Sequence, residues 1–140
     1  MTWHYWPYRI AMSVAAVLLF NQAVFAGQFL GGSYPSLATH RENATYAGIA
    51  VVVAALAAIP IRWPGRGPWW PLAATFGLFG LIALQIVLGF LRLLEIHIPL
   101  GVSIIVLAVL LVCWAWRSHP SPAQRPDEPA QAPSPAGAGR

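Results

Sequence analysis

Charged residues are scarce in this chain, and lysine is absent. Charged residues make up 9% of the 140 residues and hydrophobic residues 58%, whereas charged residues form about 25% of an ordinary soluble domain. The mean hydropathy is +0.62. A water-soluble domain with so few charges cannot cover its own surface, so a soluble enzyme is excluded. The composition therefore predicts an integral membrane protein.

Cysteine and acidic residues are also rare. The single cysteine, Cys113, lies inside an apolar run, which excludes an intrachain disulfide and a cysteine-based metal site. Four acidic residues stand against eight arginines, and the sequence pI is ≈ 10.0. In a soluble protein this balance would indicate nucleic-acid binding. Here the arginines flank hydrophobic segments, so they indicate membrane topology, and no nucleic-acid partner is expected.

Four apolar segments are each long enough to cross the roughly 30 Å of hydrocarbon in a bilayer. The predicted spans are residues 10–30, 39–61, 71–94 and 97–116, within a transmembrane domain of residues 1–117. Short connections favour an all-α, up-down-up-down antiparallel four-helix bundle. From Ser118 to Arg140 the chain has six prolines in 23 residues, a composition that predicts a disordered cytoplasmic tail.

The first segment has two interpretations. Small residues around residues 24–26 would suit cleavage of a signal peptide. The segment is nevertheless longer than a typical signal-peptide core, and it carries Asn21 and Gln22, which suit the interior of a bundle. The aromatic leader before it, including Trp3 and Trp6, suits an interfacial belt. We therefore interpret the segment as a retained span, with the cleaved peptide as the alternative.

The arginines predict the orientation of the spans. Six of them fall on one side of the four predicted spans and two on the other: Arg9, Arg62, Arg66, Arg117, Arg125 and Arg140 against Arg41 and Arg92. The side of a membrane protein that is richer in arginine and lysine faces the cytoplasm. We therefore expect a multi-pass protein of the cell inner membrane, with cytoplasmic N- and C-termini.

Two histidines are predicted to lie at similar depth near the outer face. His40 opens the second span and His97 opens the fourth, and these spans run in the same direction. At 1.5 Å per residue, both imidazoles lie roughly 30 Å above the inner face. One turn deeper on the same helix faces are small residues, Ala44 and Gly101. This pattern leaves room for a flat ligand between the two helices.

Ionisable side chains at membrane depth are costly and by default mark a functional site. Two imidazoles without a cysteine cluster suit haem iron better than zinc, which normally takes three or four protein ligands. Each histidine also has a neighbouring arginine, Arg41 and Arg92, whose guanidinium groups suit haem propionates. Two other interpretations stay open: the arginines pair with nearby glutamates or extend to the interface, and the histidines are simply hydrated among headgroups.

The chain carries a weak internal repeat, in which an amide, a glycine, a short loop and a histidine follow in order. Its second copy, Gln85-Ile86-Val87-Leu88-Gly89, a short loop and His97-Ile98-Pro99-Leu100-Gly101, resembles the third and fourth helices of one half of haem A synthase. His40-Arg41 matches the other ligand position of that half. Similar spacing occurs in a family of small uncharacterised bacterial four-helix membrane proteins. The resemblance covers about residues 10–117 and implies that His40 and His97 hold a haem.

The chain departs from that family in two respects. Haem A synthase has two such halves, and its catalytic glutamate precedes the histidine of the second helix, whereas Glu42 here follows His40. Oxidation of a haem methyl is therefore not supported, and whether the protein is an enzyme stays open. The expected function is a membrane haem b protein in electron transfer or another haem-related role. Its expected partners are the lipid bilayer and a membrane redox partner or second copy. The alternative is a cofactor-free accessory subunit of a larger membrane complex.

Overall fold

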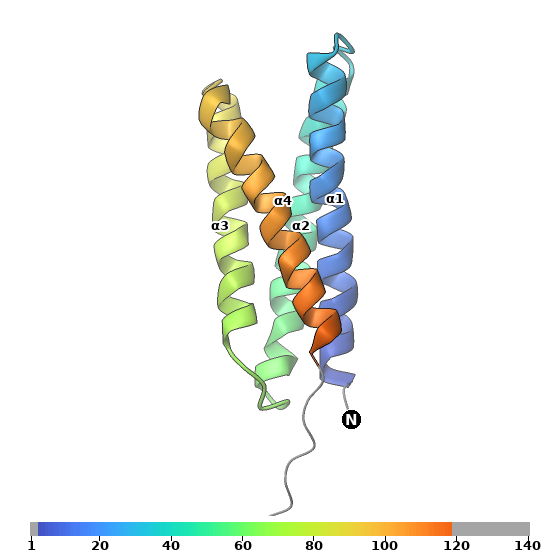
Figure 1. Cartoon of the computed structure of the whole chain (residues 1–140), viewed down its shortest axis with the longest axis vertical. Coiled ribbons are helices and arrows are strands. Elements are labelled where there is room, and N and C mark those ends of the chain that lie inside the picture. Colours follow the sequence, from blue (N-terminus) through green and yellow to red (C-terminus); the bar gives the residue numbers. More distant parts are fainter. Residues whose placement is uncertain (1–2, 119–140) are drawn as a thin grey trace, which may run out of the picture.

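The computed structural model describes residues 3–118, and within them all regular structure is helical. A short 3-10 turn, Trp3–Tyr5, precedes four long helices. These are α1 (Trp6–Leu30), α2 (Ser36–Arg62), α3 (Trp70–Phe90) and α4 (Leu94–Arg117) (Figure 1). Each helix is long and apolar enough to cross a membrane, which confirms the all-helical fold predicted from the sequence. Apart from Ser118, the predicted tail lies outside the described residues.

The four helices form a bundle in which each contacts two others. The most extensive contact joins α1 and α2, while α3 lies between α2 and α4, and α4 returns to α1. The loops after α1 and α3 lie at one end of the bundle, and the loop between α2 and α3 lies at the other (Figure 1). At the first end the α1–α2 pair and the α3–α4 pair spread apart (Figure 1). We call this the divergent end and the opposite one the convergent end.

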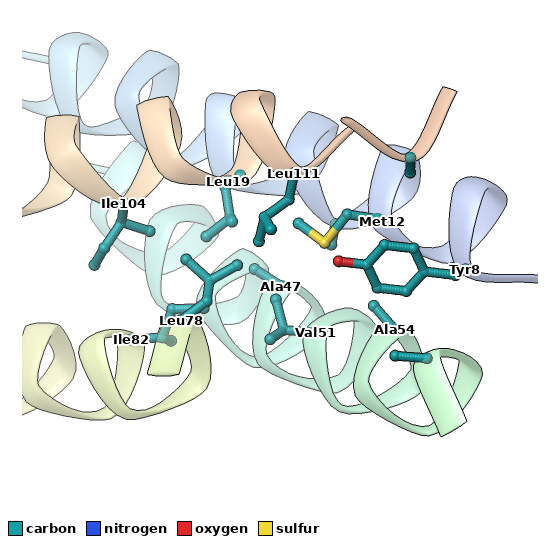
Figure 2. Packing of buried hydrophobic residues seen from close by; sticks show 14 of the residues in the cluster. Tyr8, Met12, Leu19, Ala47, Val51, Ala54, Leu78, Ile82, Ile104 and Leu111 are labelled. Carbon is teal, nitrogen blue, oxygen red and sulfur yellow. The ribbon is translucent and has the colours of Figure 1, made fainter. Parts of the chain in front are cut away.

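The hydrophobic core fills the bundle from the convergent end to about its middle. Side chains from all four helices meet there, among them Met12, Val51, Leu78 and Leu111 (Figure 2). The buried members of this cluster that lie farthest toward the divergent end are Leu19, Ala47, Ile82 and Ile104. The half of the bundle nearer the divergent end contains both His40 and His97, and it contains no buried member of this cluster beyond those four residues.

Arg9 joins the start of α1 to the end of α4 at the convergent end. Its side chain is 6% exposed; Nε donates to the Ala115 carbonyl at 2.9 Å and Nη2 to the Ser118 carbonyl at 2.8 Å. The guanidinium carbon lies 5.5–5.9 Å from the ring centres of Tyr5, Trp6 and Trp116. A cation bound to the last carbonyls of a helix satisfies them and complements the helix dipole. The residue that the sequence indicated as a topology signal therefore also binds carbonyls at the C-terminal end of α4.

The break between the third and fourth helices differs in position from the one that the sequence indicated. It lies at residues 91–93, before rather than at residues 95–96. Arg92 adopts a left-handed φ of 59°, and the Leu93 amide donates to the Leu88 carbonyl at 3.0 Å. This is a Schellman C-cap, in which the left-handed position is usually glycine. An arginine there gives no recognisable stop signal, which explains the shifted boundary.

Candidate functional site

The structure brings His40 and His97 together at the divergent end. Their ring centroids are 6.4 Å apart, with an interplanar angle of 57°, and both side chains are half-buried. Each histidine lies seven residues, or two helical turns, from the last buried core residue of its helix, Ala47 on α2 and Ile104 on α4. The two imidazoles therefore lie at equal height above the core and close to each other.

Each imidazole is fixed by a backbone carbonyl of the preceding helix. His40 Nδ1 lies 3.1 Å from the Gln22 carbonyl oxygen, and His97 Nδ1 lies 2.9 Å from that of Gln85. Because a carbonyl oxygen can only accept, Nδ1 carries the proton in both rings. The neutral imidazole then has its lone pair on Nε2, and such an Nδ1–H···O=C bond is the usual support of a metal-ligating histidine.

The two rings are close enough to contribute to one site. Their centroids lie 6.4 Å apart, so both imidazoles could bind the same metal centre. Within residues 3–118 no group of three or more histidine, cysteine or acidic side chains gathers to hold a metal. A pair of imidazoles is the axial donor set of a haem iron, whose remaining ligands come from the porphyrin. The donor set therefore fits haem better than a free metal ion.

Two glutamines surround the histidine pair. Gln85 Nε2 donates to the His97 carbonyl at 2.7 Å, so Gln85 and His97 are joined by two hydrogen bonds. The Oε1 atoms of Gln22 and Gln85 are buried and have no hydrogen-bond partner among the described residues. Buried acceptors without a partner are rare and costly, and each one calls for an explanation such as a functional role. One such oxygen therefore belongs to each of the two glutamines whose backbone carbonyls bind the histidine rings.

The glycines near the histidines have different roles. A Cβ on Gly89 would lie 3.0 Å from His97 Cε1, so this glycine lets the imidazole approach α3. A Cβ on Gly101 would lie 2.8 Å from Gln85 Nε2. The space beneath His97 is therefore taken by the Gln85 amide, and Gly101 contributes to the site by admitting that amide. The sequence instead indicated that this space would accommodate a flat ligand.

Three other helical glycines make no close helix contact within the described chain. Cβ atoms built on Gly27, Gly77 and Gly80 would meet no described atom within 4 Å. The presence of a glycine in an apolar helix does not reveal whether it lies on the face that packs against a neighbouring helix. The structure separates Gly89 and Gly101, which face the site, from these three, which face outward.

The two helix hairpins share the same histidine geometry. α1 ends on a Schellman turn with Gly32 at φ 99°, as α3 ends on one with Arg92. Gln22 and His40 lie ten residues before and eight after the first turn, whereas Gln85 and His97 lie seven before and five after the second. The first hairpin is therefore about one helical turn longer on each side, which is why the sequence repeat is weak.

Ala44 and Arg41 lie on α2 with His40, and Arg92 lies in the turn after α3. Ala44 is half-buried one turn below His40, and Arg41 and Arg92 are exposed at the divergent end. Ala44 also borders a groove of about 420 Å³ between α2 and α3. The groove is lined by Ala44, Thr45, Gly48, Ile49, Val52, Val53, Phe79, Ile82, Ala83 and Ile86. Sequence reasoning missed it, because a groove depends on how two helices are rotated against each other.

Polar side chains also join α1 to α2 near the site. Asn43 is buried and donates from Nδ2 to the Leu18 carbonyl at 2.8 Å. Ser36 donates to Gln28 Oε1 at 3.1 Å. These bonds hold the helix that carries His40 against the helix whose carbonyl binds its ring.

Of the two remaining histidines, the structure describes His4, which lies at the start of the chain and is half-buried, with its ring 3.9 Å from that of Trp3. His119 lies outside the described residues.

Comparison of the chain with protein families, with curated proteins and with solved structures gives no match. Function is therefore inferred from the geometry of the site.

Proposed function

We propose that the protein is a membrane haem b protein in which His40 and His97 are the two axial ligands of one iron. One observation carries this proposal: two imidazoles from different hairpins have ring centroids 6.4 Å apart, and each has Nδ1 hydrogen-bonded to a backbone carbonyl. This arrangement directs the Nε2 lone pairs to the ligand role without any further protonation change. A haem held in this way supplies one-electron chemistry.

The residues around the pair have definable roles. The Gln22 and Gln85 carbonyls fix the tautomer and the orientation of the rings, which raises their basicity as ligands. Arg41 and Arg92 are exposed beside the histidines and are placed to bind propionate groups by charge-assisted hydrogen bonds. Ala44 limits the side-chain volume below His40. The ring would lie toward the divergent end, beyond the last buried members of the core cluster.

The arginine bias further supports an antiparallel bundle in the cell inner membrane with cytoplasmic termini. The divergent end, with the site, would then face the outer side of the membrane. The resemblance to one four-helix half of haem A synthase agrees with the ligand assignment. Because the catalytic glutamate of that family has no counterpart before His40, we propose electron transfer or haem handling rather than oxidation of the haem itself.

A second candidate function is a cofactor-free accessory subunit of a larger membrane complex. Gly77 and Gly80 on α3 favour it, because both glycines are exposed and a Cβ there would meet no described atom within 4 Å. Small residues on an open helix face allow close approach of another transmembrane helix. This face lies outside the histidine site, so the two functions make different predictions.

The absorption spectrum of the purified protein separates the two candidates. After expression with ample haem, the first predicts a sharp Soret band and resolved visible bands on reduction, typical of six-coordinate low-spin haem b. His4→Ala is the matched control and should leave the spectrum unchanged. A folded, monodisperse but colourless protein would refute the haem proposal and leave the accessory subunit.

A further inference from the structure

The groove between α2 and α3 is open on the outer surface of the bundle. Most of its lining side chains are exposed, among them Ile49 and Phe79, and neither His40 nor His97 lines it. It lies between the α1–α2 pair and the α3–α4 pair, which spread apart toward the divergent end (Figure 1). Among the described lining residues only Thr45 has a polar side chain. In a bilayer such a groove takes up an apolar group from the surrounding membrane.

The length of the groove matches one leaflet of a bilayer. Along α2 it extends from Ala44 to Val53, which is about 14 Å at 1.5 Å per residue. Arg41 and Arg62 are 21 residues, or roughly 32 Å, apart on the same helix, close to the roughly 30 Å of hydrocarbon in a bilayer. The groove therefore extends from just below the Arg41 interface to about the midplane. One acyl chain occupies this depth, whereas a transmembrane helix crosses both leaflets.

Two opposite charges stand at the mouth of the groove. Arg41 precedes Thr45 by four residues and Glu42 precedes it by three, so both lie on the groove side of α2, one turn nearer the divergent end. Both side chains are exposed. Adjacent residues on a helix do not face each other, so the guanidinium and the carboxylate can bind two different groups of one ligand. A phosphate suits the guanidinium, and a primary ammonium group suits the carboxylate.

We propose that the α2–α3 groove binds one phospholipid with a primary-amine head group, of the phosphatidylethanolamine class. One acyl chain fills the groove, Arg41 binds the phosphate and Glu42 binds the ammonium group. The proposal does not rest on haem binding, because the groove and the histidine pair share no lining residue. A phosphate at Arg41 leaves Arg92 as the arginine for a haem propionate.

Native mass spectrometry of the full chain in mild detergent tests the head-group assignment. Phosphatidylethanolamine, phosphatidylcholine and phosphatidylglycerol with identical acyl chains are added in equal amounts. Phosphatidylcholine has no N–H donors on its quaternary ammonium group, and phosphatidylglycerol has no cation. One phospholipid per chain should be retained, with phosphatidylethanolamine favoured about two- to fivefold, the factor expected for one exposed ion pair. Glu42→Gln should remove this preference, and Arg41→Gln should weaken binding of all three phospholipids.

The groove itself is tested with a matched pair of glycine variants. Gly48→Leu places a side chain in the groove, and Gly80→Leu places the same side chain on an exposed face of α3 outside the lining. A Cβ at either position meets no described atom within 4 Å. Gly48→Leu should reduce the retention of all three phospholipids, whereas Gly80→Leu should leave it unchanged. Circular dichroism checks that each variant is folded.

Each contrary outcome overturns a defined part of the proposal. Lipid retention that is unaffected by Gly48→Leu, or reduced equally by Gly80→Leu, would exclude the groove as the binding site. A preference for phosphatidylethanolamine that survives Glu42→Gln, or a wild-type preference for phosphatidylglycerol, would contradict the head-group assignment. A lipid-free dimer would show that a second copy covers the groove instead. A colourless wild-type protein that retains the phospholipid would overturn the haem proposal alone.

Discussion

At the scale of single residues, the site depends on contacts that leave no space for a methyl group. Gly101→Ala would place Cβ 2.8 Å from Gln85 Nε2 and displace the amide that binds the His97 carbonyl. We expect a loss of about 1–3 kcal/mol in the free energy of unfolding, as for other overpacked positions. Thermal unfolding in mild detergent measures it. The loss should largely disappear in a Gln85→Ala background, where the amide is gone.

Gly80→Ala is the control for this substitution, because a Cβ there meets no described atom within 4 Å. Equal destabilisation by Gly101→Ala and Gly80→Ala, or an undiminished effect of Gly101→Ala in the Gln85→Ala background, would contradict the assigned role of Gly101.

The sequence predicted the pairing of His40 and His97 but not what holds each ring. Equal depth follows from counting residues along two parallel spans, and the structure places both rings two turns above the core. The bonds to the Gln22 and Gln85 carbonyls depend on how each helix is rotated against its neighbour. An apolar sequence encodes that rotation only through side-chain packing. A sequence shows the side chains of Gln22 and Gln85, whereas the histidine rings are positioned by the backbone carbonyls of these residues.

At the scale of helices, Arg9 should contribute more to stability than the other arginines of the convergent end. It is buried, binds two carbonyls at the end of α4 and lies among three aromatic rings. Arg9→Lys keeps the charge but loses the planar fork of donors. We expect it to destabilise the bundle by about 1–2 kcal/mol, measured as a lower unfolding temperature in detergent.

Arg62→Lys is the comparison, since Arg62 is exposed and makes one long bond of 3.4 Å. If the two substitutions lowered the unfolding temperature equally, the hydrogen bonds from Arg9 to the end of α4 would contribute no additional stability.

Helix positions followed from the sequence more closely than helix ends did. Apolar length fixed the four helices, whereas the end of α3 was shifted because Arg92 occupies the left-handed position that normally takes glycine. In α1 the same turn uses Gly32, and its position agrees with the predicted span end near residue 30. A stop signal is visible in a sequence only when the residue type reveals the backbone conformation.

At the scale of the whole molecule, haem should stabilise the protein by joining two hairpins that spread apart at the divergent end (Figure 1). The buried core stops at Leu19, Ala47, Ile82 and Ile104, so a ligand bound by both His40 and His97 adds contacts where the bundle has few. Binding to the folded state raises stability with ligand concentration. The unfolding temperature should therefore rise on haem addition to the wild type, and stay constant for the double variant His40→Ala/His97→Ala.

The two ends of the helical domain should face the same side of the membrane. Arg9 near the start of α1 binds the Ser118 carbonyl just after α4, so both ends lie at the convergent end. With the arginine bias, we expect both to be cytoplasmic. Reporters that are active only outside the cytoplasm should be silent when fused to either end. Activity at one end alone would contradict the bundle, and activity at both would reverse the orientation.

Electron paramagnetic resonance of the oxidised, haem-loaded protein tests the central claim most directly. Two imidazoles on one iron predict a low-spin ferric signal. His40→Ala removes one axial ligand and should convert the bound haem to a high-spin signal, while His4→Ala should leave the low-spin signal unchanged. A low-spin signal that persists in both His40→Ala and His97→Ala, or the absence of any haem signal in the folded wild type, would contradict the account.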